Sequence, residues 1–252
     1  MKNFNHDHAH NEGLIKLDLE TNTFSQEDYI NILIRKFTSF SRSFDSSNLD
    51  QLILFYYQLE DLRVFLYENT QSSNAEVFNV YSTYLKGIEV STEIIFKEYN
   101  SSTITGNWAV GIDGIGQATS ASLLSMIDID KAPLFNNVWR YCGLDPKQTE
   151  PGTWNPFLKN LTWKIGKSFI QFPDSFYGKL YTKELQRRTD LNKSGNYSED
   201  IPEPRLQAQA RRYATKIFLS HWHQIRYQEV NGVSPLPSFK STNYISPPNN
   251  PF

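Results

Sequence analysis

The sequence predicts a mainly α-helical protein, in which a helical N-terminal region is followed by a second helical domain. Apolar residues recur at three- and four-residue steps over long stretches, which is the spacing of one face of a helix. No glycine or proline interrupts residues 25–69, and strand-like alternation is absent there. In the second half, glycine and proline cluster at residues 111–116, 143–156 and 195–204, where they separate shorter helices from one another.

The first hundred residues are expected to form a flexible N-terminus and then an acidic helical bundle or arm. Residues 1–24 are polar and weakly patterned. A helix is predicted to begin at Ser25, because Asp28 follows it at the capping-box spacing. The apolar face of that helix consists of Tyr29, Ile30, Leu33, Phe37, Phe40 and Phe44. Two further helices are predicted over residues 48–69 and 74–99, so that residues 25–100 form one helical unit.

The net charge of −2 conceals an uneven distribution along the chain. Residues 1–100 hold 8 Lys and Arg against 15 Asp and Glu, a balance of −7, and residues 101–252 hold the remaining 17 against 12, a balance of +5. A basic half favours a polyanionic partner such as a nucleic acid. The alternative is that two halves of any chain differ by chance.

Several observations limit the class of protein. The single cysteine, Cys142, excludes an internal disulfide and a zinc site of several cysteines. No apolar run approaches the roughly 20 residues of a spanning helix, and the start, MKNFNHDHAH, lacks the apolar core of a signal peptide. The alternating His6, His8 and His10 could chelate a metal, but such a pattern more often marks a flexible tail. We therefore expect a cytoplasmic protein that has no membrane, metal or cofactor site.

The glycine-rich stretch AVGIDGIGQATSASLLSMI, residues 109–127, predicts a tight turn followed by a helix that begins near Gly116 or Gln117. Such a helix directs its free backbone N–H groups and its positive dipole end at the turn, where a phosphate oxygen can approach closely. This is how a helix-hairpin-helix element binds the nucleic-acid backbone without reading bases. Gly114 and Gly116 are the candidate backbone cradle, with Gln117 and Thr119 as hydrogen-bonding neighbours. The alternative is a plain turn between core helices, which the carboxylate of Asp113 favours.

A predicted helix over residues 205–229 carries a basic stripe about 30 Å long, at 1.5 Å per residue. At 100° per residue, one side is apolar and includes His221, and the other is basic. His221 and His223 point about 200° apart on such a helix, so they cannot chelate one ion. His221 is expected in the core. The stripe is expected to contact phosphates, although an ordinary solvated face is the alternative; its residues are Arg205, Arg212, Lys216, His223 and Arg226.

The predicted helix over residues 157–172 has an apolar side and a basic side. Lys159, Trp163 and Lys167 lie toward the basic side. Both lysines are candidate DNA contacts. Trp163 could stack on an unpaired base, whereas the more common place for a tryptophan is the core.

Three segments occur in a recognisable order: GIDGIGQATSASLLSMI, then NNVWRYCGLDP, then NPFLKNLTWKIGKSFIQF. This order resembles the C-terminal domain of the DEDD insertion-sequence transposases and the Piv-type DNA invertases, over residues 105–172. That family has a RuvC-like N-terminal nuclease with four acidic residues, and a serine shortly after its GL-x-P segment. Here residues 1–100 are predicted to be helical, and the corresponding DPKQTEPGTWNP contains no serine. The resemblance therefore implies DNA binding and a mobile-element or phage context, without matching residues for transposition.

Taken together, residues 101–230 are predicted to form a helix-hairpin-helix DNA-binding domain, followed by a flexible tail over 231–252. The expected partner is DNA, bound through phosphates with little sequence specificity in recombination or maintenance of a mobile element, and a homo-oligomer is left open. Two alternatives remain. One is a metal-dependent recombinase or nuclease whose active site the sequence does not reveal. Asp113, Asp128, Asp130 and Asp145 are close in sequence and could bind Mg²⁺, although Asp128 and Asp130 are more typical of polar residues that follow a helix. The other is a protein-interaction module in which the hairpin is purely structural.

Overall fold

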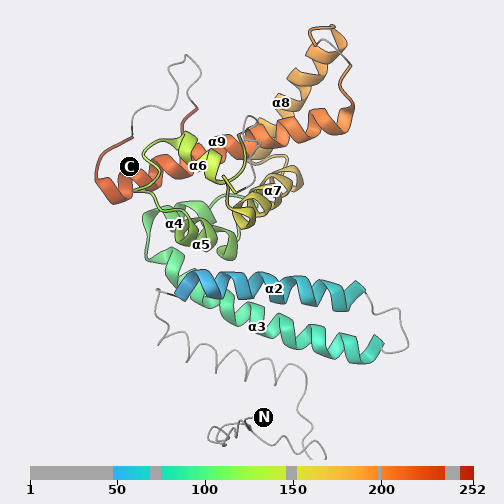
Figure 1. Ribbon diagram of the computed structural model, residues 1–252, viewed down its shortest axis with the longest axis vertical. Helices are drawn as coiled ribbons and strands as arrows, with labels where there is room; N and C mark the ends of the chain where they lie inside the picture. Colours follow the sequence, from blue (N-terminus) through green and yellow to red (C-terminus); the bar gives the residue numbers. More distant parts are fainter. Residues whose placement is uncertain (1–47, 69–74, 146–151, 198–199, 236–244) are drawn as a thin grey trace, which may run out of the picture.

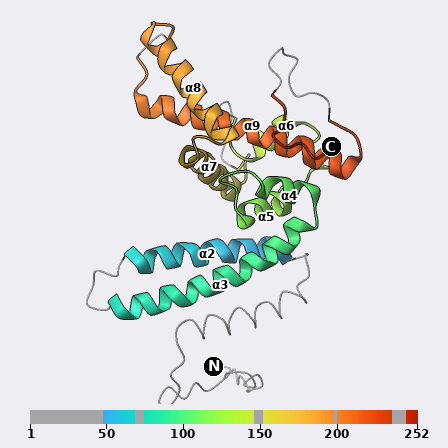
Figure 2. The same cartoon turned by 180° about the vertical axis from the view of Figure 1, so that it is seen from behind.

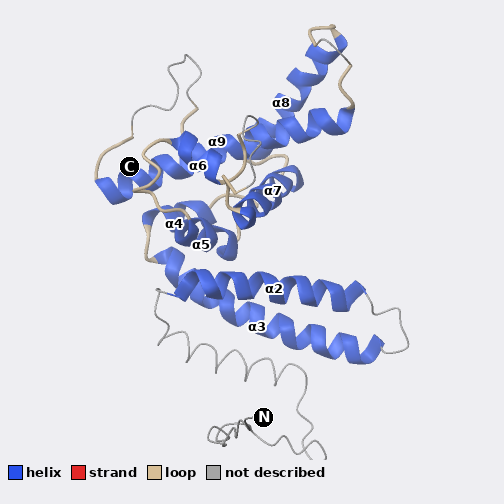
Figure 3. Cartoon of the chain, viewed as in Figure 1, coloured by secondary structure: helices blue, strands red, loops and turns tan. Residues whose placement is uncertain are grey.

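The computed structural model describes residues 48–68, 75–145, 152–197, 200–235 and 245–252 (Figure 1). Within these ranges the chain forms eight helices and no strand (Figure 3), which confirms the mainly α-helical class. The helices are α2 (Leu49–Glu68), α3 (Ala75–Ser101), α4 (Ile104–Val110), α5 (Gln117–Met126), α6 (Phe135–Tyr141), α7 (Pro156–Gln171), α8 (Phe176–Lys193) and α9 (Glu203–Asn231).

Helices α2 and α3 form a long hairpin that lies beside the remaining helices (Figure 1). Their bounds confirm the two helices predicted over 48–69 and 74–99. The predicted flexible N-terminus and the helix expected from Ser25 lie outside the described residues. A small apolar cluster joins the hairpin to α5; its buried members are Leu49, Ile53, Tyr56, Phe96, Ala118 and Ala121.

One acidic side chain is buried inside the hairpin. Glu89 is 1% exposed, and its carboxylate accepts from Arg63 Nε at 2.6 Å and from Lys86 Nζ at 3.2 Å. Nearby, the Tyr56 hydroxyl donates to Glu93 at 2.7 Å. Two cations therefore compensate the buried carboxylate, as a charge away from water requires.

The second part of the molecule is arranged around α9, a helix of 29 residues on which α4, α6, α7 and α8 pack (Figure 2). Helix α8 lies along its first part, α7 contacts it at Arg211 and Thr215, and α4 and α6 pack farther along. The core is rich in aromatic rings: Phe169 stacks on Tyr177 at 4.9 Å between centroids, and Phe218 meets Tyr177 edge-on at 5.3 Å. Phe218 also stacks on Trp108 at 5.9 Å. These contacts bring α4, α7, α8 and α9 into one core.

Glu229, near the end of α9, caps the N-terminus of α4. Its carboxylate accepts from the backbone N–H of Ile104 at 2.7 Å and of Thr105 at 3.2 Å, and it pairs with Arg226 at 3.0 Å. Burial alone would raise the pKa of Glu229, but these hydrogen bonds outweigh it and lower the pKa. An acid is stabilising at this position, because the first N–H groups of a helix have no partner within it.

The described end of the predicted flexible tail over 231–252, residues 245–252, contacts the second helical domain. The carbonyl of Pro248 accepts from Trp108 Nε1 at 2.8 Å. The carbonyl of Ile245 lies 2.7 Å from Nε2 of His221. Buried ring N–H groups need acceptors, and this segment supplies two of them from its backbone.

His221 occupies the core, as predicted, and is 3% exposed. A carbonyl only accepts, so Nε2 must carry the proton toward Ile245; Nδ1 then accepts from the Tyr177 hydroxyl at 2.8 Å. Burial lowers the pKa of His221 to about 4, although the hydrogen bond to Ile245 opposes the shift. The ring is therefore neutral in the folded protein at neutral pH.

His221→Gln is expected to reduce the loss of stability between pH 7 and pH 5. As pH falls through 6.5 the unfolded chain protonates this histidine, whereas the folded protein, with its pKa of about 4, does not. This uptake removes about 2 kcal/mol of unfolding free energy by pH 5. Glu184, Glu229 and Asp128 have lowered pKa values, and the stability that they contribute is lost only below about pH 4.5, the usual pKa of a glutamate. Urea unfolding at both pH values measures the difference, and equal losses in the two proteins would contradict the prediction.

Candidate functional site

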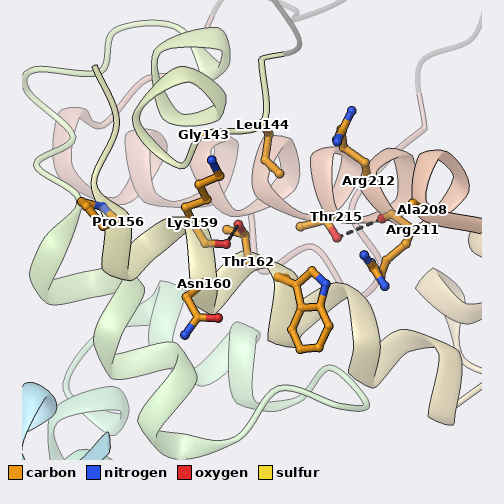
Figure 4. A pocket seen from close by; sticks show the side chains of 11 residues that line it. Gly143, Leu144, Pro156, Lys159, Asn160, Thr162, Ala208, Arg211, Arg212 and Thr215 are labelled. Atoms are coloured by element: carbon orange, nitrogen blue, oxygen red, sulfur yellow. Dashed lines mark hydrogen bonds between the residues drawn. The ribbon is translucent and has the colours of Figure 1, made fainter. Parts of the chain in front are cut away.

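A cavity of about 540 Å³ lies between α7 and α9, beneath the segment that follows α6 (Figure 4). Its lining contains three cationic side chains and no carboxylate. Within the described part of the chain, none of these cations takes part in a salt bridge. The lining residues are Gly143, Leu144, Pro156, Lys159, Asn160, Thr162, Trp163, Ala208, Arg211, Arg212 and Thr215.

Two glycines allow the three segments to meet at this cavity. A Cβ on Gly166 would lie 2.6 Å from both Arg211 Cγ and Thr215 Oγ1, so only glycine lets α7 approach α9 this closely. Gly143 has φ +66°, in the left-handed region. A Cβ on Gly143 would lie 3.0 Å from Cδ of Lys159, so a larger residue would crowd that side chain. The shape of the cavity therefore depends on backbone segments that only glycine allows to come this close.

Two of the lining cations, Lys159 and Arg211, lie against aromatic rings, as does the neighbouring Lys167. Lys159 Nζ is 4.2 Å from the centroid of Trp154. Lys167 Nζ and Arg211 Cζ lie 5.0 and 5.2 Å from that of Trp163, whose side chain is 45% exposed. Trp163 is thus outside the core. In Figure 4, Arg211 and Arg212 extend in opposite directions from α9, so they present charge to two sides of the cavity.

Lys216 continues this basic surface along α9. Its Nζ lies 4.6 Å from the centroid of Trp139, whose Nε1 donates to the Lys216 carbonyl at 3.0 Å. Burial lowers the pKa of Lys216; Asp145 opposes this shift and Arg212 adds to it. Arg205 and Arg212 are exposed on the same helix.

The assignment of His223 to the basic stripe is corrected. His223 is 2% exposed, and its Nε2 donates to the Ala132 carbonyl at 2.7 Å. Helix α9 is enclosed on nearly every side from Ala214 to Ile225, so the polar side expected there does not exist. Arg226 pairs with Glu229 instead of standing free. The basic surface is therefore confined to the first half of α9.

Arg211 lines the cavity, although its position in the sequence does not predict this. On the helical projection it falls between the apolar and basic sides. Two features of the sequence point to it: Arg211 is next to Arg212, and Gly166 in the basic helix α7 permits close packing. The tertiary contact with Gly166 could not be inferred from either helix alone.

The predicted glycine turn joins α4 to α5, which begins at Gln117 as expected. Gly114 has φ +89°, and its Cα packs against Ser168 in α7. Gly116 is the N-cap of α5; it is exposed, makes no side-chain cap hydrogen bond, and has no atom within 4 Å of the position of a Cβ. Gly114 thus has a packing role, and Gly116 leaves the N-terminus of α5 open.

Gln117 and Thr119, the predicted hydrogen-bonding neighbours of a ligand, both contact the α2–α3 hairpin. The Nδ2 of Asn100 donates to the backbone carbonyl of Gln117 at 3.0 Å and to its Oε1 at 2.8 Å. Burial raises the pKa of Tyr57 to about 12, opposed by hydrogen bonds to Thr119 and Ser122. Gln117 therefore links α5 to α3, and Thr119 links α5 to α2.

The four aspartates considered for Mg²⁺ occupy separate environments. Asp128 pairs with Lys131 at 2.9 Å and accepts from the backbone N–H of Asp130 at 3.1 Å. Asp113 is exposed in the glycine turn, and the charge of Asp145 raises the pKa of Lys216 against the effect of burial. Among the residues that the structure describes, no group of three or more His, Cys, Asp or Glu could hold a metal ion. The same residues include no helix with the length and apolar character needed to cross a membrane.

Gly114→Ala is expected to lower the free energy of unfolding by about 1–3 kcal/mol, because an alanine is strained at positive φ. Its Cβ would also lie 2.8 Å from Ser168 Oγ. Gly116→Ala is the matched control, since Gly116 has φ −82° and open space around it. Its expected cost is at most about 1 kcal/mol, for an unfavourable N-cap residue. Urea unfolding measures both variants, and equal losses would refute the separate roles of the two glycines.

Comparisons of the chain with protein-family models, with curated proteins and with solved structures give no match. The resemblance to transposase C-terminal domains stays a prediction from three short segments. The case for a function rests on the geometry of the cavity and of the glycine turn.

Proposed function

We propose that the helical domain binds DNA, mainly through the phosphate backbone, on the surface formed by α7, the first half of α9 and the N-terminus of α5. The observation that carries this proposal is the cavity lined by Lys159, Arg211 and Arg212 without a carboxylate. Phosphate oxygens supply the missing counter-charge, and the guanidinium fork binds them in a bidentate manner.

An exposed row on α7 connects the cavity to the glycine turn. Lys159, Trp163 and Lys167 are spaced four residues apart, so they lie on one face of the helix at steps of about 6 Å. Beyond Lys167, the next residue, Ser168, lies against Gly114 of the turn. A strand that follows this row meets cations first and then the open N–H groups at the end of α5.

The proposed binding has little sequence specificity, since contacts to phosphate carry no base information directly. A role in recombination or maintenance of a mobile element is supported by the order of the three sequence segments alone. All three segments contribute to the proposed surface: the glycine turn, residues 143–144, and α7.

Replacing Lys159, Arg211 and Arg212 together by Gln is expected to weaken duplex binding and to flatten its salt dependence. Each lost phosphate contact reduces the slope of log K against log salt by about 0.9, so the triple variant loses about 2–3 units of slope. Fluorescence anisotropy of a labelled duplex across a salt series measures the slope.

The matched control replaces three exposed lysines away from this surface, Lys97, Lys183 and Lys193, by Gln. It removes the same charge and is expected to retain most of the wild-type slope. Equal effects of the two triple variants would show that net charge alone matters. Absence of salt-dependent binding by the wild-type protein would refute the proposed function.

Gly116→Asp is expected to weaken DNA binding about tenfold while leaving the fold as stable as the wild type or slightly more so. An aspartate is a good N-cap and favours the helix dipole, but its charge repels a phosphate at the same N–H groups. Gly116→Asn is the control, because it caps the helix without the charge. Thermal unfolding and anisotropy measure both properties; equal affinities of the Asp and Asn variants would exclude a phosphate at this end of α5.

A further inference from the structure

We propose that the cavity between α7 and α9 holds one unpaired nucleotide of a DNA strand, with its base against Trp163 and its phosphate beside Arg211. This inference rests on the proposed DNA binding and assigns a substrate class to the same surface. It predicts a preference for single strands and overhangs over blunt duplex.

The size and lining of the cavity fit one nucleotide. Its volume of about 540 Å³ lies within the roughly 300–1,000 Å³ of small-molecule sites. Leu144 and Pro156 provide apolar wall, and the amide of Asn160 can both donate to and accept from a base edge. The hydroxyls of Thr162 and Thr215 donate to backbone carbonyls within their own helices, so they can still accept.

Trp163 provides a platform for the base. Most tryptophans are largely buried, whereas this one is 45% exposed at the edge of a cavity. Lys167 and Arg211 now lie against its ring. Stacking of a base on an aromatic ring is stronger than a cation–π contact at an exposed site, so a base can replace either cation. The displaced cation then meets the phosphate of the same nucleotide.

Only an unpaired nucleotide can use this arrangement. In a duplex each base is stacked on both faces and paired at its edge, and reaching a pocket requires that the base leave the stack. A blunt duplex can therefore use the cations but not the ring. A single strand presents its base without that unstacking cost.

The experiment compares three DNAs: a blunt duplex, the same duplex with a short 3′ overhang, and the overhang duplex with one abasic nucleotide in place of each overhang nucleotide in turn. Each is titrated against the wild type, Trp163→Ala and Trp163→Phe. Ile170→Ala serves as a matched control, because Ile170 is an exposed apolar residue on the same helix outside the cavity. Circular dichroism confirms that each variant is folded.

The wild type is expected to bind the overhang at least tenfold more tightly than the blunt duplex. Trp163→Ala should remove this factor and weaken binding to the overhang much more than binding to the blunt duplex, whereas Trp163→Phe should retain most of the factor. One abasic position should cause a similar loss in the wild type and no further loss in Trp163→Ala, because the ring and the base then act as one pair. Ile170→Ala should behave as the wild type.

Equal affinity for overhang and blunt duplex would overturn this inference while leaving backbone binding intact. The inference would also be overturned if Trp163→Ala lowered the affinity for both DNAs equally. The same holds if the effects of Trp163→Ala and of an abasic nucleotide on affinity were additive at every overhang position. Failure of the wild type to bind any of the three DNAs would instead refute the proposed function itself.

Discussion

The close enclosure of α9 is the constraint on which the rest of the second part of the molecule depends. From Ala214 to Ile225 this helix has almost no face left for water, and four other helices pack against it. Close packing at this density requires small residues where backbones meet. Gly166 is one such residue, and the same contact that brings α7 to α9 also positions Arg211 and Thr215 at the cavity. The same packing of α7 on α9 therefore determines both the core and the shape of the site.

The predictions from sequence succeeded where a local rule decides the outcome. Apolar periodicity gave the helices of the hairpin, and the glycine turn gave the start of α5, because spacing and backbone freedom are properties of short segments. The buried position of His221 followed from the same projection. Lys159, Lys167, Arg205 and Arg212 are on the surface, as their polar positions on the helices imply.

The errors share a different cause. The helical projection assumes one buried side and one wet side, whereas α9 is surrounded, and His223 accordingly donates to Ala132 inside the core. The contacts of Gln117 and Thr119 with the hairpin could not be predicted either, because the approach of α2 and α3 to α5 depends on the tertiary fold. Arg211 was missed for the same reason, since its place at the cavity depends on a partner helix about 45 residues earlier in the sequence.

The contacts of the last residues also have a consequence for how the protein folds during synthesis. The indole N–H of Trp108 donates to a carbonyl 140 residues later, and the first N–H of α4 donates to a carboxylate 125 residues later. Contacts of such separation form slowly, because a long loop must close before they stabilise anything. A ribosome that has translated only as far as α8 therefore holds a nascent chain in which α4 has its local N-cap, Thr103, and its contacts with α3 and α5, but lacks the carboxylate of Glu229 and its packing against α9. The hairpin, made of neighbouring helices, can form much earlier.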